Sequence, residues 1–476
     1  MLIPDINLFF MRVSVIQGDK INKNLLIFAK IINMDKRQYH IVQFVCIMAV
    51  LVAIALQGFT HKVKMKPLEG VVAEEQPVKL SFKNYLDGSY QAYLTEHAKR
   101  TTGFREFFIR TYNQMCYSVF DEFNNENIAE GKDGELFTYM YLDDITGKRV
   151  VDYFTSVDSA KAVARENVRV TLQLMDTLKQ HGTDFLFVFA PSKTTVYPEY
   201  VPEPYCNQVS DFSLIDYYIE LFKENNIPLI DFHNYFKEIK NEFPYPLYAK
   251  FGTHWAFGTI PFVADSILRK MEAVTGKSLP SIEVLDYNLT TDYFHQDREL
   301  EGQFNLLFPM DKPAIPNPKF VLTDTIGKDK PNLVAIADSY FVAFETTCFL
   351  YAFNSWNYLK YNDFVISSNP DYSWKKFALM PEAYDILEDA DIVMAVFTAP
   401  MLYTYMFDFP NTVFKLFDRG EANDEEKIEM MIQNIRNVPE WYEAVVKQAE
   451  EQGITVEENL RINAIYVIEN EEKNNP

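Results

Sequence analysis

Cysteine is scarce in this chain, and its few copies do not form a pattern. Of four cysteines in 476 residues, Cys46 falls inside an apolar segment, while Cys116, Cys206 and Cys348 are far apart and odd in number. A disulfide framework needs an even, patterned set, and a zinc site typically needs paired CxxC spacing. The sequence therefore specifies neither.

Positive charge is also in short supply. The chain has 45 Lys and Arg against 67 Asp and Glu, a formal charge of −22, and we find no basic cluster that reverses this balance. Such a chain repels phosphate backbones, which argues against a nucleic-acid partner. Metal-ligand spacings, a Gly-rich phosphate loop and a dinucleotide fingerprint are missing too, so we expect no cofactor.

Apolar material, in contrast, is plentiful. Hydrophobic residues make up 48% of the chain and aromatic residues 15%, which is ample for a core and unlike a disordered sequence. The length allows two or three domains, or one large α/β domain with appendages.

Only one long uncharged apolar run occurs, IVQFVCIMAVLVAIALQGF at residues 41–59. At 1.5 Å rise per residue, these 19 residues approach the hydrocarbon thickness of a bilayer. A buried core helix is the plain alternative, but the run has no polar stripe and is flanked by charges on both sides. A cleaved signal peptide is the other; the following ALQGFTHK lacks a small-x-small cleavage pattern, which favours an uncleaved anchor.

The orientation of this anchor depends on where the chain starts. Lys36 and Arg37 precede the run and three lysines follow it, and only the further basic residues of 1–33 tip the count towards a cytoplasmic N-terminus. Met34 opens MDKRQYHIVQF, which has the form of an ordinary anchor start. Residues 1–33 are thus a possible misannotated extension.

The Asp-Gly of GKDGELF predicts a tight turn between two short strands. The chain after it alternates between helical periodicity and short apolar runs. Runs at 185–189, 227–231, 332–338 and 390–398 are separated by helical patterns, which predicts βαβ units and a doubly wound parallel sheet. We expect a cytoplasmic tip and anchor at 34–60, a linker at 61–80, the α/β domain at 81–420 and a helical C-terminal appendage at 421–476.

Reactive groups in such a sheet belong at the carboxyl ends of strands. Ser339, in Ile336-Ala337-Asp338-Ser339-Tyr340, is placed where a strand ends and a helix begins, so its hydroxyl is expected above the sheet. The plain alternative is that Asp338 or Ser339 only caps the next helix.

A serine nucleophile needs a base, and two histidines have the right position. His254 lies in a loop just before a helix, beside Trp255, whose ring would exclude water; a lone His next to Trp is also common as a structural pair. His233, which follows the run IPLID, has a similar claim from position alone.

Four stretches, in this order, resemble the alginate O-acetyltransferase-like branch of the SGNH hydrolase superfamily. They are GKDGELF, FLFVFAPSKTTVYPEYVP, YAKFGTHW and IADSY, within roughly 130–400. The resemblance implies an SGNH-like fold in which Ser339 is the acyl-accepting nucleophile, His254 its base, and Asp338 the acid that precedes the serine.

Two positions depart from that family pattern. The Asp of the D-x-H-W block is Gly252 here, and the Gly before Asp338 is Ala337. Without a carboxylate the imidazole loses its orienting partner, a loss of about four orders of magnitude in a serine triad. Asp231, at the end of a neighbouring predicted strand, is the candidate substitute; a backbone carbonyl is the alternative.

Further residues, Trp255 among them, are expected to bind substrate. Lys193 and Tyr197 follow the strand FLFVFA, and they either contact a polysaccharide or pack over a Pro-rich loop. Asn354, or Asn357, would supply an oxyanion-hole amide of the kind that SGNH enzymes use.

The resemblance implies an extracytoplasmic O-acetyltransferase, single-pass in the inner membrane, that passes acetyl groups through an acyl-serine to an exported polysaccharide. Its acetyl donor would be a membrane-bound O-acyltransferase. Two alternatives stay open. One is a catalytically impaired scaffold that binds polysaccharide, which Gly252 motivates. The other is a polysaccharide acetylesterase, since water and sugar hydroxyls compete for one acyl-enzyme.

Overall fold

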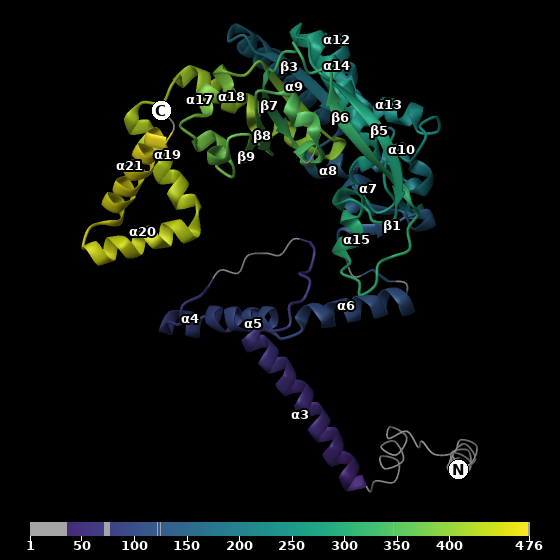
Figure 1. Cartoon of the computed structure of the whole chain (residues 1–476), viewed down its shortest axis with the longest axis vertical. Helices are drawn as coiled ribbons and strands as arrows, with labels where there is room; N and C mark the ends of the chain where they lie inside the picture. Colours follow the sequence, from purple (N-terminus) through teal and green to yellow (C-terminus); the bar gives the residue numbers. More distant parts are fainter. Residues whose placement is uncertain (1–35, 71–76, 121, 124, 346, 475–476) are drawn as a thin grey trace. The chain divides into compact units, whose positions relative to one another are not determined.

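The computed structural model describes residues 36–70, 77–120, 122–123, 125–345 and 347–474 (Figure 1). The predicted extension at 1–33 lies outside these residues. Contacts divide the chain into two compact units. The first takes the residues up to Phe123 together with 305–308, and the second takes the rest.

The first unit is built from helices alone among its described residues. It begins with α3 (Lys36–Thr60), which contains the apolar run and is the one helix of the described chain that is long and apolar enough to cross a membrane. Three short helices follow: α4 (Phe82–Leu86), α5 (Ser89–Thr101) and α6 (Arg105–Met115). A π-helical turn at Cys116–Phe120 closes this part of the chain.

The second unit opens with the predicted hairpin, β1 (Ile128–Glu130) and β2 (Leu136–Thr138). Asp133 and Gly134 both have positive φ, as its tight turn requires. This confirms the strand-turn-strand prediction for GKDGELF.

A six-stranded sheet forms the centre of the second unit, in the order β4-β3-β10-β7-β8-β9. Its strands are β3 (Asp184–Phe189), β4 (Leu229–Asp231), β7 (Asn332–Ala337), β8 (Ser355–Lys360), β9 (Phe364–Ser367) and β10 (Ile392–Phe397). All neighbours pair in parallel except β8 and β9. The predicted α/β fold is confirmed, but the sheet is mixed, because a tight turn after β8 returns the chain as an antiparallel edge.

Each face of this sheet has its own core. Along β3, Phe185, Phe187 and Phe189 enter one buried cluster, and Leu186 and Val188 enter the other. Successive side chains of a strand point to opposite faces, so a continuous apolar run is what a sheet covered on both sides needs. The covering helices are α9 (Val157–Gln180), α12 (Leu214–Glu224), α13 (Phe232–Ile239), α14 (Ile260–Thr275), α17 (Ala383–Glu388) and α18 (Phe409–Arg419).

Two parts of the second unit differ from the sequence expectation. The stretch after Ser339 was expected to be one helix, but it breaks into a 3-10 turn, the four-residue α16 (Val342–Glu345) and a second 3-10 turn at Cys348–Ala352. The pair β5 (Ser281–Thr290) and β6 (Ile315–Thr323) forms a long antiparallel arm that was not predicted (Figure 1).

The C-terminal helices form a small cluster of their own. They are α19 (Asp424–Asn437), α20 (Pro439–Gln452) and α21 (Val456–Asn474), the last yellow segments in Figure 1. Met431, Ile435, Val445 and Leu460 are buried among them. The predicted helical C-terminal part is confirmed.

Candidate active site

Ser339 begins the 3-10 turn that follows the central strand β7, and the preceding Asp338 holds this turn in place. The Asp338 carboxylate is buried; it accepts hydrogen bonds from the Tyr340 N–H at 2.9 Å and from the Thr398 N–H and hydroxyl at 2.9 and 2.8 Å. Burial raises the pKa of Asp338, although these hydrogen bonds oppose the rise. Asp338 therefore caps the turn and ties it to the end of β10.

His254 reaches Ser339 from a loop closed by bonds between its own ends. Tyr248 and Trp255 pair as an isolated bridge, and the Ala256 N–H donates to the Leu247 carbonyl at 2.8 Å. The His254 Nε2 lies 2.8 Å from the Ser339 Oγ, which is hydrogen-bonding distance between a base and a nucleophile.

The other ring nitrogen of His254 meets a carboxylate that the sequence did not reveal. Glu299, the first residue of α15 (Glu299–Gln303), places Oε1 and Oε2 at 2.7 and 2.8 Å from the His254 Nδ1. Its Oε1 also accepts from the Thr253 N–H at 2.8 Å and the His254 N–H at 3.2 Å. One carboxylate thus fixes both the ring and the loop that carries it.

Gly252 has a steric reason in this arrangement. A Cβ at this position would lie 2.7 Å from the Gln296 carbonyl oxygen and 3.3 Å from the Asp297 Cα. These backbone atoms belong to the segment that leads into Glu299. The space that a side chain at 252 would need is therefore filled by the chain that delivers the carboxylate.

Electrostatics agree with this pairing. Burial of the His254 ring opposes its charged form, but the charge and hydrogen bond of Glu299 outweigh burial, and the pKa of His254 is raised. Burial also opposes the charge of Glu299, and the His254 partner with the two backbone N–H groups nevertheless lowers its pKa. The neighbouring Asp297 has no such cation, and burial raises its pKa to about 7.

Comparison with known families matches part of this chain. Residues 128–329 match the family described as SGNH hydrolase-like domain, acetyltransferase AlgX. The matched segment resembles an SGNH hydrolase-like domain of the AlgX acetyltransferase type. The match includes Gly252, His254 and Glu299 and ends ten residues before Ser339, which the fold brings to His254.

Solved structures with similarity to this chain include three bacterial proteins. The O-acetyltransferase domain of Pseudomonas putida AlgJ is 15% identical, with 60% of this chain and 99% of that chain covered and a TM-score of 0.35. Pseudomonas aeruginosa AlgX is 16% identical over 61% and 68%, with a TM-score of 0.37. Bacillus cereus PatB1 is 12% identical over 52% and 93%, with a TM-score of 0.32. No curated protein sequence matches this chain significantly.

Asp231 does not orient the His254 ring of the AlgX-type domain. Its carboxylate accepts from the Asn234 N–H at 2.9 Å, which caps α13, and pairs with Lys223 at 2.9 Å. A strand-end carboxylate followed by a helix satisfies that helix first. The expected substitute acid was wrong, and Glu299 stands in its place.

His233, the other histidine considered, is buried at the start of α13. Its Nε2 lies 3.2 Å from the Lys237 Nζ and 3.5 Å from the Asp216 carboxylate. It therefore belongs to a separate polar cluster and not to the Ser339 site.

Three predicted substrate contacts do not line the Ser339 site. Lys193 is 3% exposed, pairs with Glu135 at 2.8 Å and donates to four backbone carbonyls. Trp255 is completely buried, with its ring 5.0 Å from that of Tyr340. Asn354 is exposed but bonds to Asn332 at the start of β7, the sheet edge opposite Ser339. The contacts of these three residues are within the domain, so they stabilise its fold and do not bind a substrate at Ser339.

Tyr197, the remaining predicted contact, is half-buried on the same side of the domain as the His254 loop. Its hydroxyl accepts a hydrogen bond from the Leu247 N–H at 3.0 Å. Since Leu247 lies at the base of the His254 loop, Tyr197 steadies that loop.

Tyr361, which sequence reasoning missed, lies directly against the nucleophile. It follows β8 in a left-handed conformation, and its hydroxyl lies close enough to Ser339 for that residue to act on the pKa of the phenol. Burial raises the pKa of Tyr361 and outweighs the opposing effect of Ser339, so the phenol stays protonated at neutral pH. A turn residue after an unpredicted strand carries no sequence signal for this position.

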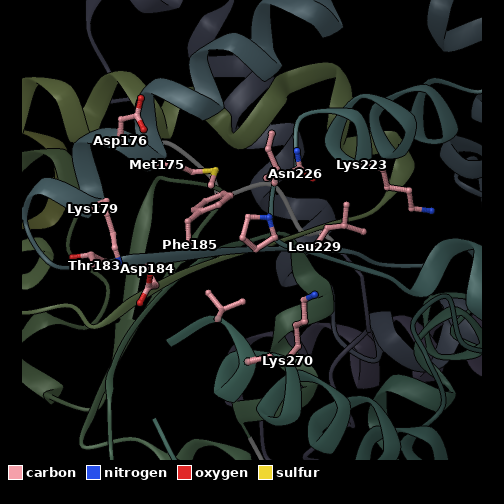
Figure 2. A pocket seen from close by; sticks show the side chains of 14 residues that line it. Met175, Asp176, Lys179, Thr183, Asp184, Phe185, Lys223, Asn226, Leu229 and Lys270 are labelled. Atoms are coloured by element: carbon pink, nitrogen blue, oxygen red, sulfur yellow. Dashed lines mark hydrogen bonds and ion pairs between the residues drawn. The ribbon is translucent and has the colours of Figure 1, made fainter. Parts of the chain in front are cut away.

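One cavity among the described residues lies away from this site. It has a volume of about 700 Å³ and is lined by the residues that lead into β3 and β4, with Lys179, Lys223 and Lys270 around it (Figure 2). Strands of a parallel sheet present their catalytic loops at the carboxyl ends. This cavity is at the amino ends and takes no part in the chemistry of Ser339.

Proposed function

We propose that this protein is a membrane-anchored extracytoplasmic O-acetyltransferase that moves acetyl groups through Ser339 to a hydroxyl of an exported polysaccharide. The observation that carries the proposal is the continuous relay Ser339–His254–Glu299, with contacts of 2.8 and 2.7 Å, in an AlgX-type domain. A serine, a base and an acid that orients the base are the parts that acyl transfer through serine needs.

The first half-reaction forms the acyl-serine. The Ser339 Oγ attacks the carbonyl carbon of an acetyl ester while the His254 Nε2 takes the hydroxyl proton, and Glu299 stabilises the imidazolium. The Tyr361 hydroxyl, next to Ser339, would donate to the oxyanion. When the C–O bond to the donor breaks, the leaving oxygen takes the proton from His254.

The second half-reaction repeats these roles with a sugar hydroxyl. His254 removes the sugar proton, the sugar oxygen attacks the acetyl-Ser339 carbonyl, and Ser339 leaves with the proton returned by His254. Every bond and proton in these steps is handled by side chains, so the mechanism calls for no cofactor.

The anchor gives the proposal its location and its donor. α3 has the length and composition of a membrane span, and a cytoplasmic N-terminus places everything after it outside the cytoplasm. An acetyl group made in the cytoplasm must then cross the bilayer. A membrane-bound O-acyltransferase is the partner that would deliver it to Ser339.

The scaffold alternative was motivated by Gly252, and the contacts of Glu299 weaken it. A chain that had lost catalysis has no need for a carboxylate, supplied by Glu299 in place of the missing Asp, at 2.7 Å from the His254 Nδ1. The esterase alternative uses the same relay, and only an acceptor experiment separates it from transfer.

The test uses the full chain in detergent with an acetyl-ester donor, with and without a panel of oligosaccharide acceptors. Wild-type protein is expected to accumulate an acetyl group on Ser339 without acceptor, seen by peptide mass spectrometry, and to acetylate the acceptor when it is present. Ser339→Ala and His254→Ala should abolish both, while Ser159→Ala, a serine in α9, should leave both unchanged. Unaltered acceptor acetylation in the first two variants would refute the proposal, and release of free acetate alone, with every acceptor, would assign an esterase.

A further inference from the structure

The helix α6 carries an exposed apolar stripe. Phe108, Tyr112 and Met115 are spaced by four and three residues, which places them on one helix face. Their exposed fractions are 45%, 55% and 48%, and the π-helical turn that follows adds Val119 and Phe120. A helix of a water-soluble protein turns such a stripe towards the core.

The polar side of α6 faces the protein instead. The two Arg110 Nη atoms donate to the carbonyls of Lys66 and Pro67 at 2.9 and 2.8 Å, and the Gln114 Oε1 accepts from the Phe308 N–H at 3.0 Å. Asn113, on the same side, is buried. The helix is therefore inverted relative to a soluble one: polar groups inside, apolar groups outside.

The helices α4 and α5 lack buried residues altogether. Large apolar side chains in and next to them are nevertheless exposed, and they are Leu80 (66%), Phe82 (82%), Tyr85 (57%), Leu86 (67%) and Leu94 (44%). So many exposed apolar side chains in a short segment mark an interaction surface.

The depth of this segment is fixed by its contact with α3. A Cβ on Gly103, in the turn between α5 and α6, would lie 2.1 Å from the Ile54 carbonyl oxygen and 2.7 Å from the Gly58 nitrogen. Ile54 and Gly58 are the sixth and second residues before Thr60, the end of α3. At 1.5 Å per residue, the turn lies about 3–9 Å below the end of the helix. That is the interfacial depth of a bilayer that α3 spans.

The charge of this part of the chain also differs from the rest. Residues 61–120 hold nine Lys and Arg against six Asp and Glu, whereas the whole chain carries a formal charge of −22. Basic residues close to a span favour anionic headgroups, by about 1 kcal/mol each.

We infer that α4, α5 and α6 lie in the interface of the bilayer that α3 spans, with the apolar stripe in the acyl-chain boundary and the basic residues among anionic headgroups. This inference rests on the anchor of the proposed function. It adds an in-plane platform to that anchor, which would restrict how far the following domain moves away from the surface.

The experiment uses the full chain reconstituted in phosphatidylethanolamine and phosphatidylglycerol vesicles, with single tryptophans as depth probes. Met115→Trp and Val119→Trp each report on the stripe, Leu51→Trp reports on the middle of α3, and Ile326→Trp, at a site 95% exposed in the second unit, is the matched control. Quenching is measured with lipids brominated near the headgroup or near the chain end, relative to the parent protein with its four native tryptophans.

The emission of the two stripe probes is expected to shift to the blue and to be quenched most by bromine near the headgroup. The Leu51→Trp probe should be quenched most by bromine near the chain end. The Ile326→Trp probe should be quenched by neither lipid. If the tryptophan at position 51 is quenched and those at positions 115 and 119 are not, the platform is refuted and the anchor stays intact. Because the vesicles contain no other protein, that result would assign the stripe to a protein partner. Unquenched Leu51 would refute the anchor itself. Circular dichroism confirms that each variant is folded.

Discussion

Gly252 and Glu299 share one volume next to His254. The segment that delivers Glu299 occupies the space of a 252 side chain. Gly252→Asp restores the acid of the family pattern, yet we expect it to lower acetyl-ester turnover and thermal stability, because the new Cβ displaces backbone atoms at a cost of about 1–3 kcal/mol. Gly252→Ala should show the same loss of stability. Higher turnover in Gly252→Asp would contradict this explanation.

Glu299 sets the protonation of His254 as well as its position. A base must be neutral to accept the serine proton, so turnover should fall as pH drops through the raised pKa of His254. Glu299→Gln removes the charge that raises the pKa of His254, while burial of the ring still lowers that pKa. The acid limb of kcat/KM against pH should then move to lower pH, with kcat reduced by about 10²–10⁴-fold. An unmoved limb would show that Glu299 only holds the loop.

Asp297 is a buried carboxyl with no cation beside it, and its pKa in the folded protein is about 7 against about 3.9 in an unfolded chain. The folded state therefore binds the proton more tightly, and stability falls as pH rises from about 4 to about 7. Asp297→Asn cannot lose a proton and keeps an oxygen for the Phe257 N–H. At pH 8 the variant should unfold at a higher temperature than wild type, and its unfolding free energy should be larger by up to about 4 kcal/mol. At pH 4 the two proteins should be equally stable. A difference that does not grow with pH would contradict the raised pKa.

At the scale of elements, Lys193 joins the β1–β2 hairpin to the His254 loop. Its Nζ pairs with Glu135 and donates to the carbonyls of Leu136 and of three residues in the loop. Lys193→Met leaves these acceptors buried and unpaired, so we expect a loss of about 3–5 kcal/mol in unfolding free energy. Lys179→Met, at an exposed pair with Asp184, is the control and should change stability by less than about 1 kcal/mol. Chemical denaturation of both variants measures the difference.

At the scale of the whole molecule, the proposed anchor predicts on which side of the membrane the chain after α3 lies. Alkaline phosphatase fused after Pro476 should be active in cells, and green fluorescent protein at the same place should be dark, because only the first folds outside the cytoplasm. N-terminal sequencing of the same fusions tests whether the chain starts at Met34. A fluorescent C-terminal fusion would reverse the proposed orientation.

Much of this protein was readable from local patterns. Helical and strand periodicities predicted the runs that became β3, β4, β7 and β10, because a strand covered on both faces needs continuous apolar residues. β8 and β9 were missed since SWNYLK mixes polar and aromatic residues, and the edge strand β9 is only four residues long. Ser339 and His254 were picked out because of where they lie in the pattern of elements. Ser339 follows an apolar strand run, and His254 lies in a loop just before a helical pattern.

The sequence by itself determined the long apolar helix, the α/β class, and the candidate pair of Ser339 and His254. Only the tertiary structure decided which acid completes the pair. Glu299 is 45 residues from His254 along the chain, and no spacing rule connects them. The same holds for Lys193, which its position in the sequence predicted to be exposed and which tertiary packing buries. It also holds for α6, whose periodicity is identical whether its stripe faces a core or a bilayer. Periodicity fixes which residues share a face, and only the neighbours of that face decide what it contacts.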